Sequence, residues 1–284
     1  MKRNIKRGLC LSGGGSHGAY QVGVLKALSE SGRSWDYVSG VSVGSINGIF
    51  IAMHKPEEQK KAIEALEKMW KTDIKNNSSI YKPWFFWPIN YIASFWKGSL
   101  NHTKPLEKIL EKYFDKNKLE NSGVALRIGA ASLKTGDYKI ATEKSDNIIK
   151  WVLASSSMPL IFNPTIIDND ILIDGGVRNI TPLSDIIDLQ LEEIDVVLAD
   201  TLETIEKRKK FTNILNVGIR SLEIMINEIY KTDIVYCKNE KIHNVKVRIY
   251  APNEALKYES FNFNPSTLIE TIKTGYEETL VKIK

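Results

Sequence analysis

The pentapeptide Gly40-Val41-Ser42-Val43-Gly44 lies between a segment that predicts a strand and one that predicts a helix. A Gly-x-Ser-x-Gly motif at such a turn presents the serine hydroxyl at the carboxyl end of the strand. Glycine is needed on both sides, because a Cβ would collide with the neighbouring strand or helix. The hydroxyl then stands at a helix N-terminus, where the helix dipole favours a developing negative charge. The pattern predicts Ser42 as a nucleophile, against the alternative of a packing contact between small residues.

The segment Asp174-Gly175-Gly176 supplies a candidate base for that serine, and it follows two short apolar runs separated by a polar turn. A serine nucleophile needs a group that accepts its proton, and in most hydrolases a histidine does so between the serine and an acid. Only His243 follows Asp174 in the chain, within a polar turn. Two hypotheses stay open on these residues. One is a triad through His243, and the other is direct proton transfer to Asp174, whose pKa burial would raise and hydrogen bonds would restrain.

A glycine cluster, Gly13-Gly14-Gly15-Ser16-His17-Gly18, lies between the first predicted strand and the first predicted helix. It fits the Gly-x-Gly-x-x-Gly pattern of dinucleotide-binding folds, but that hypothesis requires an acidic residue at the end of the second strand. Asp36 precedes the second strand, which instead leads into Ser42. Consecutive glycine N–H groups at a helix start can hold a carbonyl oxygen as it becomes negative. We therefore expect an oxyanion hole at Gly13, Gly14 and Gly15, with a plain tight turn as the remaining alternative.

Apolar runs and helical periodicities alternate along the chain and place each motif at the end of a predicted strand. We expect strands at 8–12, 37–41, 124–133, 137–142, 194–199 and 245–250, and a hairpin at 166–173. We expect helices at 18–32, 43–54, 57–71, 104–114, 146–157, 210–230 and 265–282. This alternation predicts an α/β three-layer sandwich with a mostly parallel central sheet. The simplest organisation is one domain over residues 5–284, with the motifs in a core at 8–190 and a helical cap insertion at about 55–120.

The composition is that of an ordinary globular protein, with 43% apolar and 26% charged residues and a net charge of +5. The longest basic cluster, Lys207–Lys210, is either a solvated helix start or a contact for an anionic membrane surface. It has no interleaved aromatic residues, so nucleic-acid binding is not expected. Two cysteines and four scattered histidines form no metal-ligand pattern, and we expect no metal or other cofactor. The N-terminus has no signal-peptide pattern and no apolar run is long enough for a membrane span, so we expect a cytoplasmic protein.

With its three motifs in this order, the chain resembles the patatin-like phospholipases, which carry a glycine-rich oxyanion loop, then Gly-x-Ser-x-Gly, then Asp-Gly-Gly or Asp-Gly-Ala. The resemblance covers roughly residues 8–190. It implies a Ser42–Asp174 dyad without a catalytic histidine or cofactor, on a mostly parallel sheet between helices. The residues that it implies as support for the site are Ser16, His17, Gly18, Gly40, Gly44, Gly175 and Gly176. His17 departs from the family pattern, in which arginine or lysine is usual, and it either orients the loop or meets an anionic head group.

An aromatic stretch at residues 81–96 contains Trp84, Trp87 and Trp96 and lies within the predicted cap. Its side chains either pack inward or form an interfacial loop for peripheral membrane contact, because Trp and Tyr favour the membrane–water boundary. Together with the resemblance, this predicts a serine acyl hydrolase that cleaves carboxylic esters of phospholipids or lysophospholipids and releases a fatty acid. Two alternatives stay open: an acyltransferase, in which an alcohol or thiol replaces water, and an inactive relative that only binds lipid or nucleotide.

Overall fold

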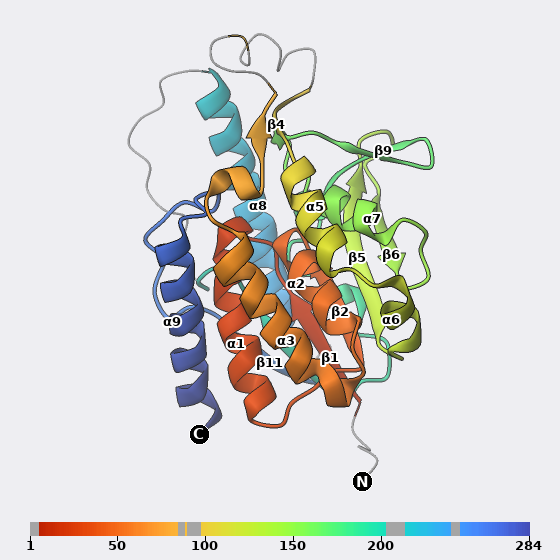
Figure 1. Ribbon diagram of the computed structural model, residues 1–284, viewed down its shortest axis with the longest axis vertical. Helices are drawn as coiled ribbons and strands as arrows, with labels where there is room; N and C mark the ends of the chain where they lie inside the picture. Colours follow the sequence, from red (N-terminus) through yellow and green to blue (C-terminus); the bar gives the residue numbers. More distant parts are fainter. Residues whose placement is uncertain (1–5, 85–88, 90–97, 203–213, 240–244) are drawn as a thin grey trace.

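The computed structural model describes residues 6–84, 89, 98–202, 214–239 and 245–284, and a mixed sheet of eight strands forms its middle (Figure 1). The strands are β1 (Arg7–Leu11), β2 (Tyr37–Val41), β5 (Ala125–Ser132), β6 (Tyr138–Thr142), β8 (Thr165–Ile167), β9 (Asp170–Asp174), β10 (Glu193–Val197) and β11 (Lys246–Tyr250). Their order is β11-β10-β1-β2-β5-β9-β8, with β6 also paired to β5. The first five of these strands run parallel, whereas β6 and β9 are antiparallel to β5. The predicted, mostly parallel sheet is therefore confirmed.

Helices cover both faces of this sheet, and each face has its own apolar core (Figure 1). The helices are α1 (Gly18–Glu30), α2 (Val43–Ala52), α3 (Gln59–Lys68), α5 (Lys104–Tyr113), α6 (Lys116–Asn121), α7 (Ile148–Ser155), α8 (Ile214–Lys238) and α9 (Pro265–Ile283). Leu9 and Leu11 of β1 belong to the core shared with α1, α2, α3 and α9, whereas Cys10 belongs to the core shared with α8. Because neighbouring side chains of a strand point to opposite faces, one short strand serves both layers.

The segment expected as a cap, residues 55–120, contributes to the larger of these two cores. Leu66, Trp70 and Leu110 are buried there together with the side chains of β1 and α2. The predicted helix at 57–71 is interrupted, since it begins with a 3-10 turn, continues as α3 and ends in a π-helical turn at Met69–Asp73. π-Helical turns are rare and are frequent at functional sites. This one buries the side chains of its first two residues beside the cavity described below.

A second, small sheet lies next to the main one, and its strands were not predicted. It consists of β3 (Lys82–Pro83), β4 (Ser99–His102) and β7 (Leu160–Phe162). These strands contain two to four residues each, which is too short for a period of two to stand out in the sequence. β7 is placed by its pairing with β4, a contact that the local sequence does not reveal.

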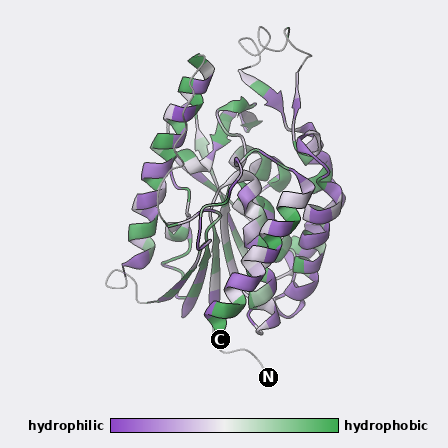
Figure 2. Cartoon of the chain, turned by 90° about the vertical axis from the view of Figure 1, so that its left-hand side faces the viewer, coloured by the Kyte–Doolittle hydropathy of each residue, from purple (hydrophilic) through white to green (hydrophobic). Residues whose placement is uncertain are grey.

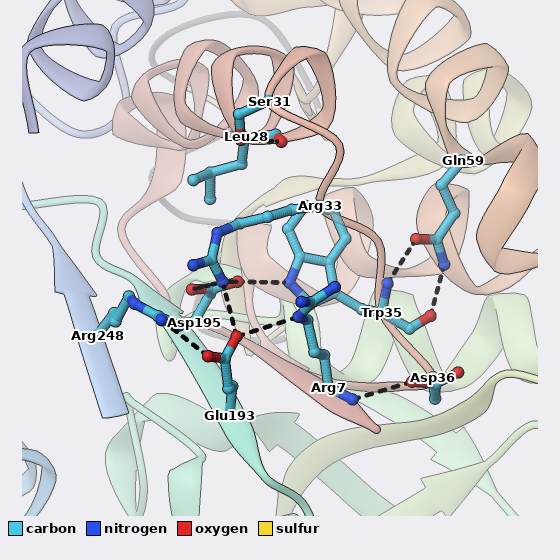
Figure 3. A network of polar contacts seen from close by, with 10 residues as sticks. All are labelled: Arg7, Leu28, Ser31, Arg33, Trp35, Asp36, Gln59, Glu193, Asp195 and Arg248. Carbon is cyan, nitrogen blue, oxygen red and sulfur yellow. Dashed lines mark hydrogen bonds and ion pairs between the residues drawn. The ribbon is translucent and has the colours of Figure 1, made fainter. Parts of the chain in front are cut away.

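Charged residues gather at the amino end of the main sheet, opposite the end at which the three motifs follow their strands (Figure 3). The carboxylate of Glu193 accepts hydrogen bonds from Arg248 at 2.8 Å, Arg7 at 3.1 Å and Arg33 at 3.3 Å. The fully buried Asp195 is bound by Arg33 at 3.1 Å. These ion pairs join the starts of β1, β10 and β11.

Candidate active site

β2 and β9 meet end to end along one edge of β5, and this arrangement brings the second and third motifs together. Val41, the last residue of β2, pairs with Gly129, and Asp174, the last residue of β9, pairs with Ala130. β6 pairs with the same two β5 residues from the opposite edge, so β2 and β9 share one edge. β2 runs parallel to β5 and β9 antiparallel to it. Their carboxyl ends therefore face each other, and Ser42 lies beside Asp174.

Ser42 has the backbone conformation of a nucleophile elbow. Its φ of 53° and ψ of −128° lie in a region that non-glycine residues rarely adopt. Its N–H donates to the hydroxyl of Ser155 at 2.9 Å, and its carbonyl accepts from the N–H and hydroxyl of Ser45 at 2.9 and 2.6 Å. Hydrogen bonds thus hold both the N–H and the carbonyl of the serine, directly before the first turn of α2.

Three of the motif glycines are required by close backbone contacts. A Cβ on Gly44 would lie 2.2 Å from the carbonyl oxygen of Leu11, and one on Gly40 would lie 2.3 Å from that of Gly44. A Cβ on Gly175 would lie 2.4 Å from the carbonyl oxygen of Gly129. Each distance is far below a normal contact, so a side chain at any of these positions would push apart the two backbone segments that meet there.

Asp174 is buried and its partners are uncharged. Its Oδ1 accepts the N–H of Gly176 at 2.8 Å, and its own N–H donates to the carbonyl of Ser157 at 3.0 Å. Burial raises the pKa of Asp174 to about 7, while Ser42 and the hydrogen bond from the Gly176 N–H limit the rise. A carboxylate with a pKa near neutrality is a far better proton acceptor than an ordinary one.

The glycine loop approaches Ser42 from β1, and its three N–H groups are not equivalent. The N–H of Gly13 donates to the carbonyl of Ile180 at 2.9 Å, so it is engaged within the protein. Among the hydrogen bonds of the described residues, none has the N–H of Gly14 or Gly15 as its donor. Gly15 adopts a φ of +58°, and a Cβ there would lie 2.1 Å from the carbonyl oxygen of Ser260. The free donors that could meet an oxyanion are thus those of Gly14 and Gly15.

Ser16 and His17 attach this loop to the segment that precedes α9. The N–H of Ser16 donates to the carbonyl of Ser260 at 2.7 Å. The Nε2 atom of the buried His17 lies 2.9 Å from the carbonyl oxygen of Tyr258, and the two rings pack edge to face at 4.8 Å. Gly18 begins α1, where a Cβ would lie 2.2 Å from a methyl group of α2. These contacts favour the first of the two roles open for His17, that of orienting the loop.

Ser42, Asp174 and the glycine loop open into a cavity of about 240 Å³. One wall is apolar and is formed by the π-helical turn, α2 and α5, with Ile46, Met69, Trp70, Ile74, Leu106 and Ile109. α8 also lines the cavity and contributes its polar groups Arg220, Glu223 and Asn227, together with Ile226 and Tyr230. An elongated apolar molecule with one polar end matches this lining.

Two groups of residues that contact the site were not predicted. Ser155, the last residue of α7, and Ser157, two residues further, hold Ser42 and Asp174, respectively. The run of three serines before Pro159 was a visible signal, since a polar run that ends a helix can satisfy backbone groups elsewhere. The second group is the segment around Tyr258, for which the sequence contains no comparable signal.

Some predictions fall on residues that the structure does not describe. His243 lies outside the described residues, as do residues 85–88 and 90–97 of the aromatic stretch. Of that stretch, Trp84 donates its indole N–H to the hydroxyl of Ser99 at 3.1 Å. Within the described part of the chain there is no cluster of His, Cys, Asp and Glu that could hold a metal ion. No helix among the same residues combines the length and the apolar character of a membrane span.

Known proteins resemble this chain over about three fifths of its length. The lysophospholipase NTE1 of Pyricularia oryzae is 26% identical over 184 residues, which is 61% of this chain and 11% of that protein. The human patatin-like phospholipase domain-containing protein 6 is 27% identical over 179 residues, which is 61% of this chain and 12% of that protein. This chain thus spans little more than a tenth of the length of these relatives.

The fold of nearly the whole chain resembles a solved structure. The crystal structure of VipD from Legionella pneumophila superposes on 98% of this chain and 66% of its own, with a TM-score of 0.50 and 16% sequence identity. A family model described as patatin-like phospholipase matches residues 9–187, which include the glycine loop, Ser42 and Asp174. The chain therefore belongs to the patatin-like phospholipase family.

Proposed function

We propose that this protein is a lipid acyl hydrolase in which Ser42 is the nucleophile and Asp174 its base. The observation that carries the proposal is a buried carboxylate with a raised pKa that lies beside a strained serine at the wall of a largely apolar cavity. Membership of the patatin-like phospholipase family supports a lipid substrate. On the same grounds we propose that residues 5–284 form one catalytic domain, because residues 55–120 share its larger core.

The reaction begins when Asp174 takes the proton of the Ser42 hydroxyl as its oxygen attacks the ester carbonyl. The carbonyl oxygen becomes an oxyanion, which the N–H groups of Gly14 and Gly15 stabilise. When the intermediate collapses, the bond between the carbonyl carbon and the alcohol oxygen breaks, and the leaving alcohol takes the proton from Asp174. The fatty acyl group is now bound to Ser42 as an ester.

Water completes the cycle. Asp174 removes a proton from a water molecule, whose oxygen attacks the acyl carbonyl, and the bond to the serine oxygen breaks. Ser42 recovers a proton through Asp174, and the fatty acid leaves. The apolar wall accommodates the acyl chain, and the polar groups of α8 lie where the rest of the lipid would extend.

The test compares wild type, Ser42→Ala and Asp174→Asn on a short-chain p-nitrophenyl ester and on phospholipid vesicles, with released acid measured. We expect hydrolysis by wild type alone, and labelling of Ser42 by a fluorophosphonate, with the site identified by mass spectrometry. Circular dichroism checks that both variants are folded. Full activity of Asp174→Asn would contradict the dyad, and inertness of wild type on every ester would contradict the hydrolase. Transfer of the acyl group to an added alcohol at the expense of free acid would instead indicate a transferase.

A further inference from the structure

α8 consists of two halves with different surroundings. In the second half, Tyr230, Ile234 and Cys237 are buried against the sheet. In the first half, residues 214–226, no side chain that the structure describes is buried. This half extends past the strands, as Figure 2 shows, yet it is rich in isoleucine, leucine, valine and methionine.

The first half of α8 has its charges on the inner side and apolar residues on the outer side. Arg220 and Glu223 line the cavity and form an ion pair at 3.1 Å. Ile214, Val217 and Met225 lie outside the cavity lining and are 81%, 49% and 57% exposed. A surface helix of a globular protein normally shows the reverse, with an apolar stripe facing the core and polar residues facing water.

A strained leucine lies beside this helix. Leu160 of β7 is 41% exposed and has a φ of +70°, which is a rare conformation for a bulky residue. A Cβ placed on Gly218 of α8 would lie 3.4 Å from its side chain, so Leu160 is in contact range of the helix. Such strain persists only where the surrounding structure holds it, and it recurs at functional sites.

We propose that the outer face of α8 docks on the surface of a neutral lipid aggregate. This face consists of four residues of the helix and the neighbouring residue of β7: Ile214, Val217, Ile224, Met225 and Leu160. This inference rests on the proposed function, because a phospholipid must leave its aggregate to reach Ser42. The helix that carries this face also lines the cavity, so docking would bring the cavity close to the lipid surface. Contiguous exposed apolar surface of this kind marks binding sites for proteins or membranes.

The distribution of charge on the first half of α8 favours a neutral lipid surface. Between 214 and 225 the only charged residues are Arg220 and Glu223, which face inward and pair with each other. The outer face therefore has no charge with which to recognise an anionic head group. Docking by burial of apolar side chains predicts binding to zwitterionic vesicles that does not depend on salt.

The chain contains a matched pair of residues for the test. Val217 and Val235 are 18 residues apart on α8, which is five helical turns, so both lie on the same side of the helix. Val235 is 67% exposed and lies in the second half, away from the cavity. Val217→Asp and Val235→Asp thus place the same charge on the same side of one helix, and only the first alters the proposed docking face.

Binding is measured by co-sedimentation with phosphatidylcholine vesicles in the Ser42→Ala background, where hydrolysis cannot alter the vesicles. We expect Val217→Asp to lower the partition coefficient about tenfold, because burial of one valine side chain corresponds to roughly that factor. We expect Val235→Asp to bind as the parent does, and 0.5 M NaCl to have no effect. Because this assay needs no turnover, failure of docking and failure of the hydrolase are separate results.

Turnover provides the second measurement. In the otherwise wild-type chain, Val217→Asp should lower hydrolysis of vesicle lipid by about the same factor and leave hydrolysis of a soluble short-chain ester unchanged. Equal vesicle binding by the two valine variants would overturn the proposal. So would binding that requires anionic lipid and disappears in salt. A dimer in size-exclusion chromatography that Val217→Asp converts to a monomer, without loss of vesicle binding, would assign the face to a second copy of the chain.

Discussion

Two buried aspartates near opposite ends of the sheet have opposite environments. Asp195 lies between the guanidinium of Arg33 at 3.1 Å and the indole N–H of Trp35 at 2.9 Å, next to Glu193 and its arginines. Asp174 accepts a hydrogen bond from the N–H of Gly176, lies beside Ser42, and has no charged partner among the described residues. Burial raises the pKa of both carboxyl groups, but Arg33 and Trp35 oppose the rise at Asp195, whereas the pKa of Asp174 reaches about 7. The difference between the two sites is therefore the cation, which opposes the rise in pKa that burial causes and holds the carboxylate in an ion pair.

The largest expected effect is that of Asp174→Asn on activity. We expect kcat on a short-chain ester to fall by about 10³-fold or more, because the amide cannot accept the serine proton. The same change removes a buried charge that has no ionic partner, so the free energy of unfolding at neutral pH should stay equal or rise. Urea denaturation and initial rates measure both quantities. A large loss of stability at pH 7 would mean that Asp174 is held by an ionic partner.

Asp195→Asn should have the complementary effect. The change leaves Arg33 without its buried partner, and we expect the free energy of unfolding to fall by about 3 kcal/mol. Activity of the folded fraction should remain close to that of wild type, because Asp195 is remote from Ser42. The measurement is urea denaturation followed by fluorescence, with the ester rate taken in the absence of denaturant. A variant that is stable but inactive would contradict the division between the two ends of the sheet.

Acidification should lower activity through Asp174, at the carboxyl end of the sheet. Since Asp174 must be ionised to accept the proton of Ser42, kcat/KM should fall tenfold per pH unit below about 7. The rates are measured between pH 5 and 8 on the short-chain ester, with circular dichroism at each pH as the control for folding. A rate that stays level down to pH 5 would show that no group with a pKa near 7 serves as the base.

Asp174 and Glu193 should change the free energy of unfolding with pH in opposite directions. Between pH 4 and 7 the unfolded chain releases the proton of Asp174 before the folded protein does. The contribution of Asp174 to the free energy of unfolding therefore falls as the pH rises. Arg248, Arg7 and Arg33 lower the pKa of Glu193 to about 2, so its stabilisation is complete above about 4.5 and is lost toward pH 2. Denaturation curves of wild type and Asp174→Asn should therefore diverge from pH 4 to 7.

The smallest expected effect tests how neutral hydrogen bonds hold the strained serine. Ser155→Ala removes the acceptor of the Ser42 N–H, and we expect kcat to fall about tenfold with little change in KM. Ser145→Ala is the matched control, because the Ser145 hydroxyl also accepts a backbone N–H at 2.9 Å, from Thr142, outside the site. Equal losses of activity in both variants would reduce Ser155 to a structural role, and restoration by Ser155→Thr would support positioning of Ser42.

Much of the fold could be predicted from local patterns, and the failures occur where long-range contacts decide. The predicted strands at 8–12, 37–41 and 194–199 are present, because short segments of mostly apolar and small residues are typical of strands buried on both faces. The predicted helix at 57–71 was only partly right, since burial of Met69 and Trp70 occurs in a π-helical turn. The predicted end of a helix at 230 was too early, because Ile234 and Cys237 continue the buried side of α8 to Lys238.

By itself, the sequence determined the local chemistry of this protein: three glycine-containing turns, a serine before a helix and an aspartate at the end of a strand. These depend on short-range sterics, which only a few residue types satisfy. The tertiary structure alone decided that β2 and β9 meet end to end on β5, that Gly13 is engaged by Ile180, and that Ser155 supports Ser42. It also decided which of two buried aspartates has a cation beside it. Those properties depend on which distant segments share an edge, a turn or a buried space, and no local pattern encodes that choice.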